Sequence, residues 1–154
     1  MRQRCDCGFT LLELLIVLVI VAISVSLVGI SLGERHSLED ESQRLARLLE
    51  QAQMEARTTG YALAWSFEPG SYHFFRNNNG WELMDTDEMF HSRNLTGNVV
   101  IAGVKFNGVV LAPKEKMLFT ASGLYAVFSI TLADDKTSMA LVGGTDGRVR
   151  VEKI

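Results

Sequence analysis

The chain of 154 residues contains little cysteine and little proline. Its two cysteines, Cys5 and Cys7, both precede a long apolar run, and no cysteine follows that run. A disulfide within the remaining chain is therefore excluded. The Cys-x-Cys pair supplies only two of the four ligands that a structural zinc site requires. No proline occurs between Phe9 and Arg57, so nothing of that kind interrupts a helix there.

The chain also lacks an excess of positive charge. It has 15 Lys and Arg residues against 18 Asp and Glu residues, which gives a formal net charge of -3. This acidity argues against nucleic acid as a partner bound through overall charge. Arg148 and Arg150 alternate on a predicted strand and so share one face, which leaves a local basic patch open. An ordinary exposed strand face is the simpler interpretation.

Patterns that carry catalysis or metal binding are missing from the sequence. The three histidines have no metal-ligand spacing, and no phosphate-binding loop, nucleophile elbow or pair of catalytic carboxylates occurs. Asp134 and Asp135 offer oxygen atoms of the kind that calcium binds. Their loop is short and contains Lys136, so an ordinary hairpin turn is the preferred interpretation. We predict that the protein is not an enzyme and that it has no cofactor and no metal.

The most conspicuous feature that is present is an apolar run near the N-terminus. Residues 14–32 carry no charge, and about 20 apolar helical residues cross the hydrocarbon core of a bilayer. A secretory signal has a shorter apolar region and a small-residue cleavage site, which this run lacks. We expect a transmembrane helix over residues 9–32, with Arg2 and Arg4 keeping the N-terminus in the cytoplasm. A plain membrane anchor leaves Glu13 unexplained.

The stretch GFTLLE, residues 8–13, gives Glu13 a context. Followed by a long Leu/Ile/Val helix, it resembles the class III signal of type IV pilins and type II secretion pseudopilins. The resemblance implies that a prepilin peptidase removes the basic leader of residues 1–8 by cutting between Gly8 and Phe9. It also implies that the new N-terminal Phe9 is methylated, and that the apolar helix is retained as the stem of a filament.

Glu13 is costly at this place, since a carboxylate at mid-membrane costs about 2.5 to 3.5 kcal/mol. Cleavage after Gly8 would create a positive amine on Phe9, and pairing with such an amine offsets that cost. The resemblance implies that the amine belongs to a neighbouring subunit, which makes Glu13 half of an assembly charge pair. The alternative is that Glu13 lies in the headgroup zone and is only solvated.

Residues 33–60 are predicted to continue the same helix in amphipathic form. Apolar residues recur there at steps of three, four or seven, and the charged residues mostly occupy the other faces. The apolar stripe consists of Leu38, Leu45, Leu48, Leu49, Ala52 and Ala56. Gly60 is the predicted helix stop.

Residues 61–154 are predicted to form a β-rich head. Short segments of strand character alternate there with turn residues, among them the run of residues 77–80 and the pair at 146–147. Strands are expected at 61–67, 72–76, 81–84, 99–104, 109–111, 117–120, 125–132, 139–142 and 148–152. Residues 86–98 are expected to be a polar connection. The predicted fold class is α+β, a long N-terminal helix packed against antiparallel β-sheets.

Two stretches resemble the minor pseudopilin H group of type II secretion systems. The first is LARLLEQAQMEARTTG in the predicted helix, and the second is the tail, where Phe119, Gly123, Gly147 and Arg148 match the pattern of the group. The tail departs from that pattern just before Gly123, where a proline is common. The resemblance implies a subunit of a periplasmic pseudopilus. Its expected partners are other major and minor pseudopilins, the prepilin peptidase, an inner-membrane assembly platform and membrane lipid.

Two other functions stay open at this point. One is a minor pilin of a type IV pilus, involved in assembly or DNA uptake, which would share both the leader and the tail pattern. The other is a periplasmic domain that is anchored and never assembles. All three place the chain in the bacterial inner membrane in a single pass, with its head in the periplasm.

Overall fold

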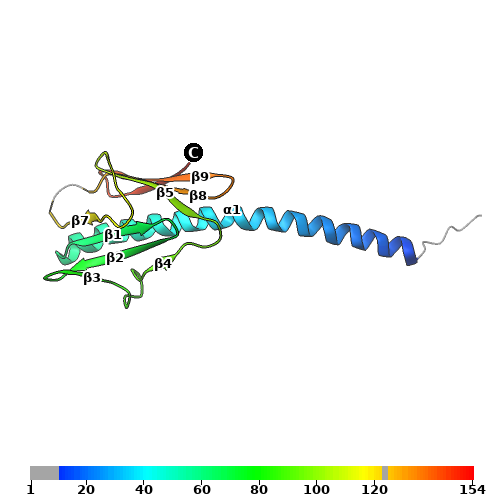
Figure 1. Ribbon diagram of the computed structural model, residues 1–154, viewed down its shortest axis with the longest axis horizontal. Coiled ribbons are helices and arrows are strands. Elements are labelled where there is room, and N and C mark those ends of the chain that lie inside the picture. Colours follow the sequence, from blue (N-terminus) through cyan, green and yellow to red (C-terminus); the bar gives the residue numbers. More distant parts are fainter. Residues whose placement is uncertain (1–10, 123–124) are drawn as a thin grey trace, which may run out of the picture. The chain divides into compact units, whose positions relative to one another are not determined.

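The structure is a computed structural model that describes residues 11–122 and 125–154, with the backbone alone for residues 23–37. It consists of one helix, α1 (Leu11–Thr59), and ten strands (Figure 1). The strands are β1 (Leu63–Glu68), β2 (Ser71–Asn77), β3 (Trp81–Leu83), β4 (Arg93–Asn94), β5 (Val100–Phe106), β6 (Val109–Val110), β7 (Met117–Phe119), β8 (Phe128–Ala133), β9 (Ser138–Gly143) and β10 (Val149–Lys153). The chain divides into two units, residues 1–35 and residues 36–154.

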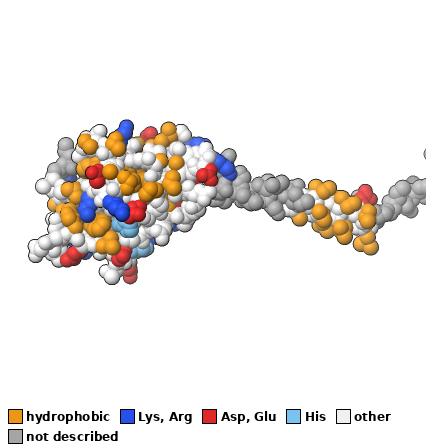
Figure 2. All heavy atoms as spheres, in the orientation of Figure 1, with side chains coloured by type: hydrophobic (Ala, Val, Ile, Leu, Met, Phe, Trp, Pro, Cys, Tyr) orange, Lys and Arg blue, Asp and Glu red, His pale blue; other side chains and the backbone are white. Residues whose placement is uncertain are grey.

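The first unit contains the beginning of α1, and the described side chains of that part, residues 11–22, are apolar apart from Glu13. The large hydrophobic side chains from Leu11 to Val21 are between 48% and 91% exposed, and Figure 2 shows an almost wholly hydrophobic surface there. Within the described residues, no helix combines the length and apolarity that crossing a membrane requires. The predicted span of residues 9–32 extends beyond the residues whose side chains are described.

The second unit begins with an amphipathic part of α1, as the sequence predicts. All six residues of the apolar stripe are buried, and Leu45, Leu49, Ala52 and Ala56 are fully inaccessible. The helix ends at Thr59. Gly60 has a φ of +78°, and its N–H donates to the carbonyl oxygen of Ala56 at 3.1 Å. This left-handed residue satisfies a carbonyl at the helix end, which is why glycine stops the helix here.

Two antiparallel sheets cover this part of α1 (Figure 1). The first has the strand order β3-β2-β1-β7, with β4 paired to β2, and the second has the order β10-β9-β8-β5-β6. Their inner faces meet the helix in one hydrophobic core, to which Trp65 and Phe74 contribute from the first sheet and Ile130 and Leu141 from the second. The predicted α+β class is therefore confirmed.

Most predicted strand boundaries differ from the structure by one or two residues. The first strand begins at Leu63 rather than 61, and the expected polar connection of residues 86–98 contains β4. The strand expected from 125 begins only at Phe128. Ala126 instead donates its N–H to Oε1 of Gln53 in α1, at 3.1 Å. Because this backbone group is bonded to the helix, it is not available to a sheet.

Candidate functional site

The residues predicted to direct processing lie at the N-terminal end of the chain. Gly8 and Phe9 are outside the described residues, so their roles stay predictions. Glu13 lies in the first turn of α1 with an exposed side chain. The positive end of the helix dipole favours a carboxylate at this place. The structure therefore gives Glu13 a favourable local position without testing the predicted charge pair.

A buried carboxylate in the head was missed by the sequence analysis. Glu41 is only 3% exposed, accepts a hydrogen bond from Oγ1 of Thr96 at 2.9 Å, and lies 3.2 Å from Nη1 of Arg44. Its contacts attach the residues before β5 to the helix. The signal was present in the sequence, because Glu41 is three residues after Leu38 and four before Leu45 and thus shares their helix face.

Tyr72 on β2 lies close enough to Glu41 and Arg44 for their charges to influence the pKa of its hydroxyl group. Burial raises the pKa of the Tyr72 hydroxyl to about 12, and the negative charge of Glu41 acts in the same direction. Among the described residues, the buried hydroxyl oxygen of Tyr72 has no hydrogen-bond partner. The ring itself packs against Trp65 and Phe74, at centroid distances of 6.5 Å and 6.0 Å. Tyr72 therefore contributes its ring to the core, while its hydroxyl group bonds to none of the described residues.

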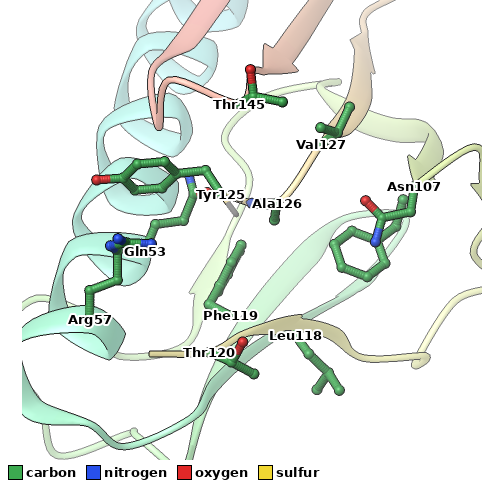
Figure 3. Close-up of a pocket in the computed structure, with 11 residues that line it drawn as sticks. Gln53, Arg57, Asn107, Leu118, Phe119, Thr120, Tyr125, Ala126, Val127 and Thr145 are labelled. Atoms are coloured by element: carbon green, nitrogen blue, oxygen red, sulfur yellow. Dashed lines mark hydrogen bonds between the residues drawn. The ribbon is translucent and has the colours of Figure 1, made fainter. Parts of the chain in front are cut away.

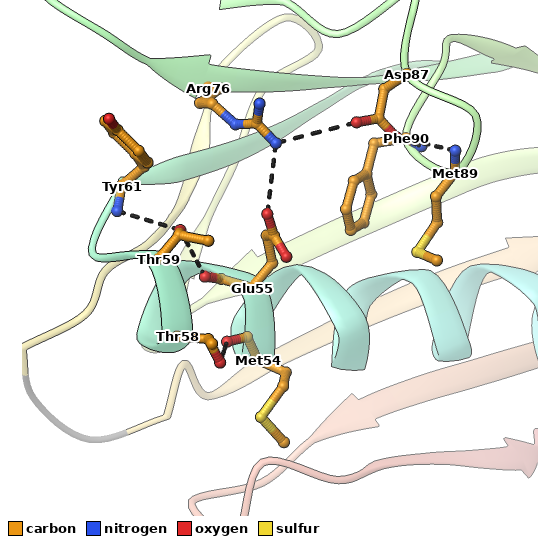
Figure 4. A network of polar contacts seen from close by, with 9 residues as sticks. All are labelled: Met54, Glu55, Thr58, Thr59, Tyr61, Arg76, Asp87, Met89 and Phe90. Atoms are coloured by element: carbon orange, nitrogen blue, oxygen red, sulfur yellow. Dashed lines mark hydrogen bonds and ion pairs between the residues drawn. The ribbon is translucent and has the colours of Figure 1, made fainter.

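A second charged network joins the end of α1 to the first sheet (Figure 4). Nη2 of Arg76 lies 3.5 Å from Oε1 of Glu55 and 4.0 Å from Oδ2 of Asp87. The other oxygen of Asp87 accepts the N–H groups of Met89 and Phe90, which shapes the loop after β3. All three charged side chains are about one third exposed, so this network positions the loop more than it stabilises the fold.

A cavity of about 350 Å³ lies beside α1, bounded by β7, the end of β5 and the segment before β8 (Figure 3). It is lined by Gln53, Arg57, Phe106, Asn107, Leu118, Phe119, Thr120, Tyr125, Ala126, Val127 and Thr145. Aromatic and aliphatic groups make up much of the wall, and amide and hydroxyl groups interrupt it. Such a mixture suits a ligand with an apolar body and a few hydrogen-bonding groups.

Gln53 and Arg57 give this cavity its polarity. Gln53 is 3% exposed; its Oε1 accepts from the N–H of Ala126, whereas its Nε2 has no acceptor among the described residues. The guanidinium carbon of Arg57 lies 4.5 Å from the centre of the Tyr125 ring. Leaving a buried donor unsatisfied costs about 1 to 3 kcal/mol. The sequence alone does not single out Gln53, because a glutamine between apolar helix positions gives no distinctive signal.

Two residues of the tail pattern support the wall of this cavity. Gly147 has a φ of +79°, and a Cβ placed on it would lie 2.6 Å from the Tyr125 ring, so only glycine fits. Phe119 is buried and packs edge to face against Phe128, with ring centroids 6.4 Å apart. Gly123 lies outside the described residues. These contacts explain why a phenylalanine occupies position 119 and a glycine occupies position 147.

The two arginines of the predicted basic patch are both exposed. Nη2 of Arg150 lies 3.0 Å from Oδ2 of Asp146, and the N–H of Arg148 donates to the other oxygen of Asp146 at 3.2 Å. Asp146 therefore offsets part of the positive charge of this patch. The predicted strand of residues 148–152 begins only at Val149, so Arg150 is exposed on β10, whereas Arg148 lies just before the strand, in a turn that Asp146 organises.

The loop of Asp134 forms the hairpin turn that the sequence favoured. Oδ1 of Asp134 accepts the N–H groups of Lys136 and Thr137 at 2.8 Å and 2.7 Å. The bond from Lys136 is the main reason why the pKa of Asp134 lies below its ordinary value. One carboxylate oxygen thus satisfies the backbone of the turn between β8 and β9.

Comparisons with known proteins identify the family. Residues 41–151 match the family described as type II transport protein GspH, and residues 3–29 match the prokaryotic N-terminal methylation motif. The chain belongs to the GspH family. The resemblance to minor pseudopilin H that the sequence suggested is therefore confirmed, on most of the head and on the N-terminal segment. No curated protein matches the chain.

Solved structures show the same fold as this GspH-family chain. Two structures of the minor pseudopilin EpsH from the type II secretion system of Vibrio cholerae match with TM-scores of 0.59 and 0.61, at 15% and 14% identity. They cover 76% and 75% of this chain and 97% and 93% of their own chains. The type IV minor pilin FimU of Pseudomonas aeruginosa matches at a TM-score of 0.54 and 16% identity, covering 77% of this chain and 90% of its own.

Proposed function

We propose that the chain is a minor pseudopilin, a structural subunit of the periplasmic pseudopilus of a type II secretion system. This pseudopilus drives the export of folded proteins across the outer membrane. The observation that carries the proposal is that one chain combines the GspH family over residues 41–151 with the methylation motif over residues 3–29. The role is structural and not catalytic, with other major and minor pseudopilins as the main partners.

The proposal includes processing at the N-terminus. The prepilin peptidase cleaves between Gly8 and Phe9 and methylates Phe9, and the remaining helix keeps the subunit in the inner membrane in a single pass. Support comes from the methylation motif and from the basic residues Arg2 and Arg4, which favour a cytoplasmic N-terminus. The head then lies in the periplasm, where an inner-membrane assembly platform adds the subunit to the pseudopilus.

Assembly depends on Glu13 in this account. Its carboxylate pairs with the methylated amine of Phe9 of a neighbouring subunit, and lipid and neighbouring stems cover the exposed apolar side chains from Leu11 to Val21. Their exposure of 48% or more in the isolated chain supports such covering, because burying one Leu, Ile or Val side chain contributes about 1.5 to 3 kcal/mol.

The test is to replace Glu13 with alanine and measure both cleavage and incorporation in cells that express the whole secretion system. Cleavage should continue. The amount of protein that co-purifies with other pseudopilins should fall at least about tenfold, which corresponds to a loss of about 1.4 kcal/mol of assembly free energy. Glu39→Ala, an exposed carboxylate on the same helix, is the matched control and should assemble normally. Normal assembly of Glu13→Ala would refute the charge pair.

A minor pilin of a type IV pilus is the second candidate, and the structural likeness to FimU favours keeping it. A gel-shift assay of the full-length protein in detergent against duplex DNA separates the two. A pseudopilin should give no shift at moderate salt. A shift that disappears as salt rises would favour DNA uptake, because phosphate contacts are salt-sensitive.

A further inference from the structure

The cavity beside α1 is lined by a positively charged side chain and by no negatively charged one. The residues that line it include Arg57 but no aspartate or glutamate, although the whole chain is acidic. Nε2 of Gln53 belongs to a side chain that is 97% buried, and no described acceptor satisfies it. The unused donor of Gln53 calls for an oxygen that accepts a hydrogen bond, and the positive charge of Arg57 at the wall favours a negatively charged oxygen. A carboxylate is the group that satisfies both.

The rim of the cavity has the features of a strand-binding edge. β7 is the last strand of its sheet; it pairs with β1 on one side, and no described strand pairs with its other side. Leu118 on β7 and Val127 opposite are both 43% exposed at this rim. An open strand edge with exposed apolar side chains is a ready template for another extended chain.

We propose that this cavity binds an extended segment of a partner subunit. The main chain of that segment lies along the free edge of β7, apolar side chains cover Leu118 and Val127, and one aspartate or glutamate accepts a hydrogen bond from Nε2 of Gln53 near Arg57. The inference rests on the proposed function, since the partner is taken to be another pilin-like subunit of the same assembly.

Photo-crosslinking tests this directly. The full-length chain carries p-benzoylphenylalanine in place of Leu118 and is expressed with the other pseudopilins, and the cross-linked peptide is sequenced by mass spectrometry. We expect one contiguous segment of one pilin-like subunit, with an acidic residue in it. Gln53→Glu keeps the acceptor for Ala126 but removes the donor and repels a carboxylate. It should lower the cross-link yield about tenfold or more.

The controls separate binding from folding. Gln51→Glu makes the same change on an exposed position of α1 outside the cavity and should leave the yield unchanged. Thr145→Asp adds a negative charge at an exposed position of the cavity wall, where folding tolerates it, and should lower the yield as Gln53→Glu does. The same probe at Val109, on the edge of the other sheet, should not respond to either change.

Several results would overturn the inference. These are a yield unaffected by Gln53→Glu and Thr145→Asp, cross-links spread over unrelated segments, or capture of a lipid or small molecule alone. If the chain co-purifies with other pseudopilins but gives no cross-link at position 118, only the cavity inference is wrong. If it co-purifies with none of them, the proposed function is wrong as well.

Discussion

The two parts of α1 use the same residue types in opposite ways. Leu11, Leu15 and Leu18 are 91%, 63% and 60% exposed, whereas Leu45 and Leu49 are fully buried under the two sheets. The leucines of the second part pack against their own chain, whereas the large hydrophobic side chains from Leu11 to Val21 in the first part stay about half exposed or more. The difference indicates that the first part is built for surroundings outside the chain, which in our proposal are lipid and neighbouring stems.

Leucine truncation in each part should give the largest contrast. Leu49→Ala removes buried methyl groups and leaves a cavity, so it should lower the free energy of unfolding by about 2 to 5 kcal/mol. Leu15→Ala, in the exposed part, should change it by no more than about 0.5 kcal/mol. Denaturant unfolding of the full-length variants in the same detergent, followed by tryptophan fluorescence, measures both. Equal losses would remove the distinction between the two parts.

Two glutamates extend the comparison to polar groups. Glu41→Ala removes a buried carboxylate that serves Thr96 and Arg44, and it should cost about 1 to 3 kcal/mol of unfolding free energy. Glu39→Ala lies only two residues away but is exposed, so its effect should stay within about 0.5 kcal/mol. Thermal unfolding of the matched pair checks this. Similar melting temperatures would mean that the contacts of Glu41 contribute nothing to stability.

Two glycines allow the same comparison of buried and exposed positions for a single added methyl group. Gly108 and Gly147 have nearly the same φ, +83° and +79°, but a Cβ meets no atom within 4 Å at Gly108 and lies against Tyr125 at Gly147. Backbone strain costs about 1 to 2 kcal/mol in both alanine variants. Gly147→Ala should cost more than Gly108→Ala by denaturant titration. The reverse order would show that the contact with Tyr125 is not tight.

The smallest effect is expected at Tyr72. Its hydroxyl is buried without a described partner, so Tyr72→Phe should leave the stability at pH 7 within about 0.5 kcal/mol or raise it. The pKa of Tyr72 is raised to about 12 in the folded chain, above the ordinary value of 10.0. The unfolded chain therefore loses this proton first, and stability should fall as pH rises from 10 toward 12. Unfolding titrations over this range should show less of that fall in Tyr72→Phe.

The sequence predicted the architecture well because its signals are periodic. The stripe from Leu38 to Ala56 repeats with the helical period, and Gly60 has no side chain that would oppose a positive φ. Both features can therefore be recognised from the sequence alone. The missed features depend on contacts between distant residues. β4 pairs with a strand about 20 residues earlier, and the segment before β8 is bonded to Gln53, 73 residues before Ala126.

The candidate site divides in the same way. Gly8, Phe9 and Glu13 form a local motif whose spacing can be recognised without a structure. The cavity is assembled from α1, β5, β7 and the segments before β8 and β10, so no local pattern in the sequence predicts it. Glu41 lies between these cases. Its helical phase predicts burial, but charge alone would place it outside.

Mass spectrometry of the mature N-terminus tests the central claim most directly. In our proposal, processing removes the leader and leaves the first part of α1 as the assembly stem. Intact-mass and peptide analysis of protein from the native host should therefore find N-methylated Phe9 as the first residue. A mature protein that still begins at Met1, or that has been cut after the apolar run, would contradict it.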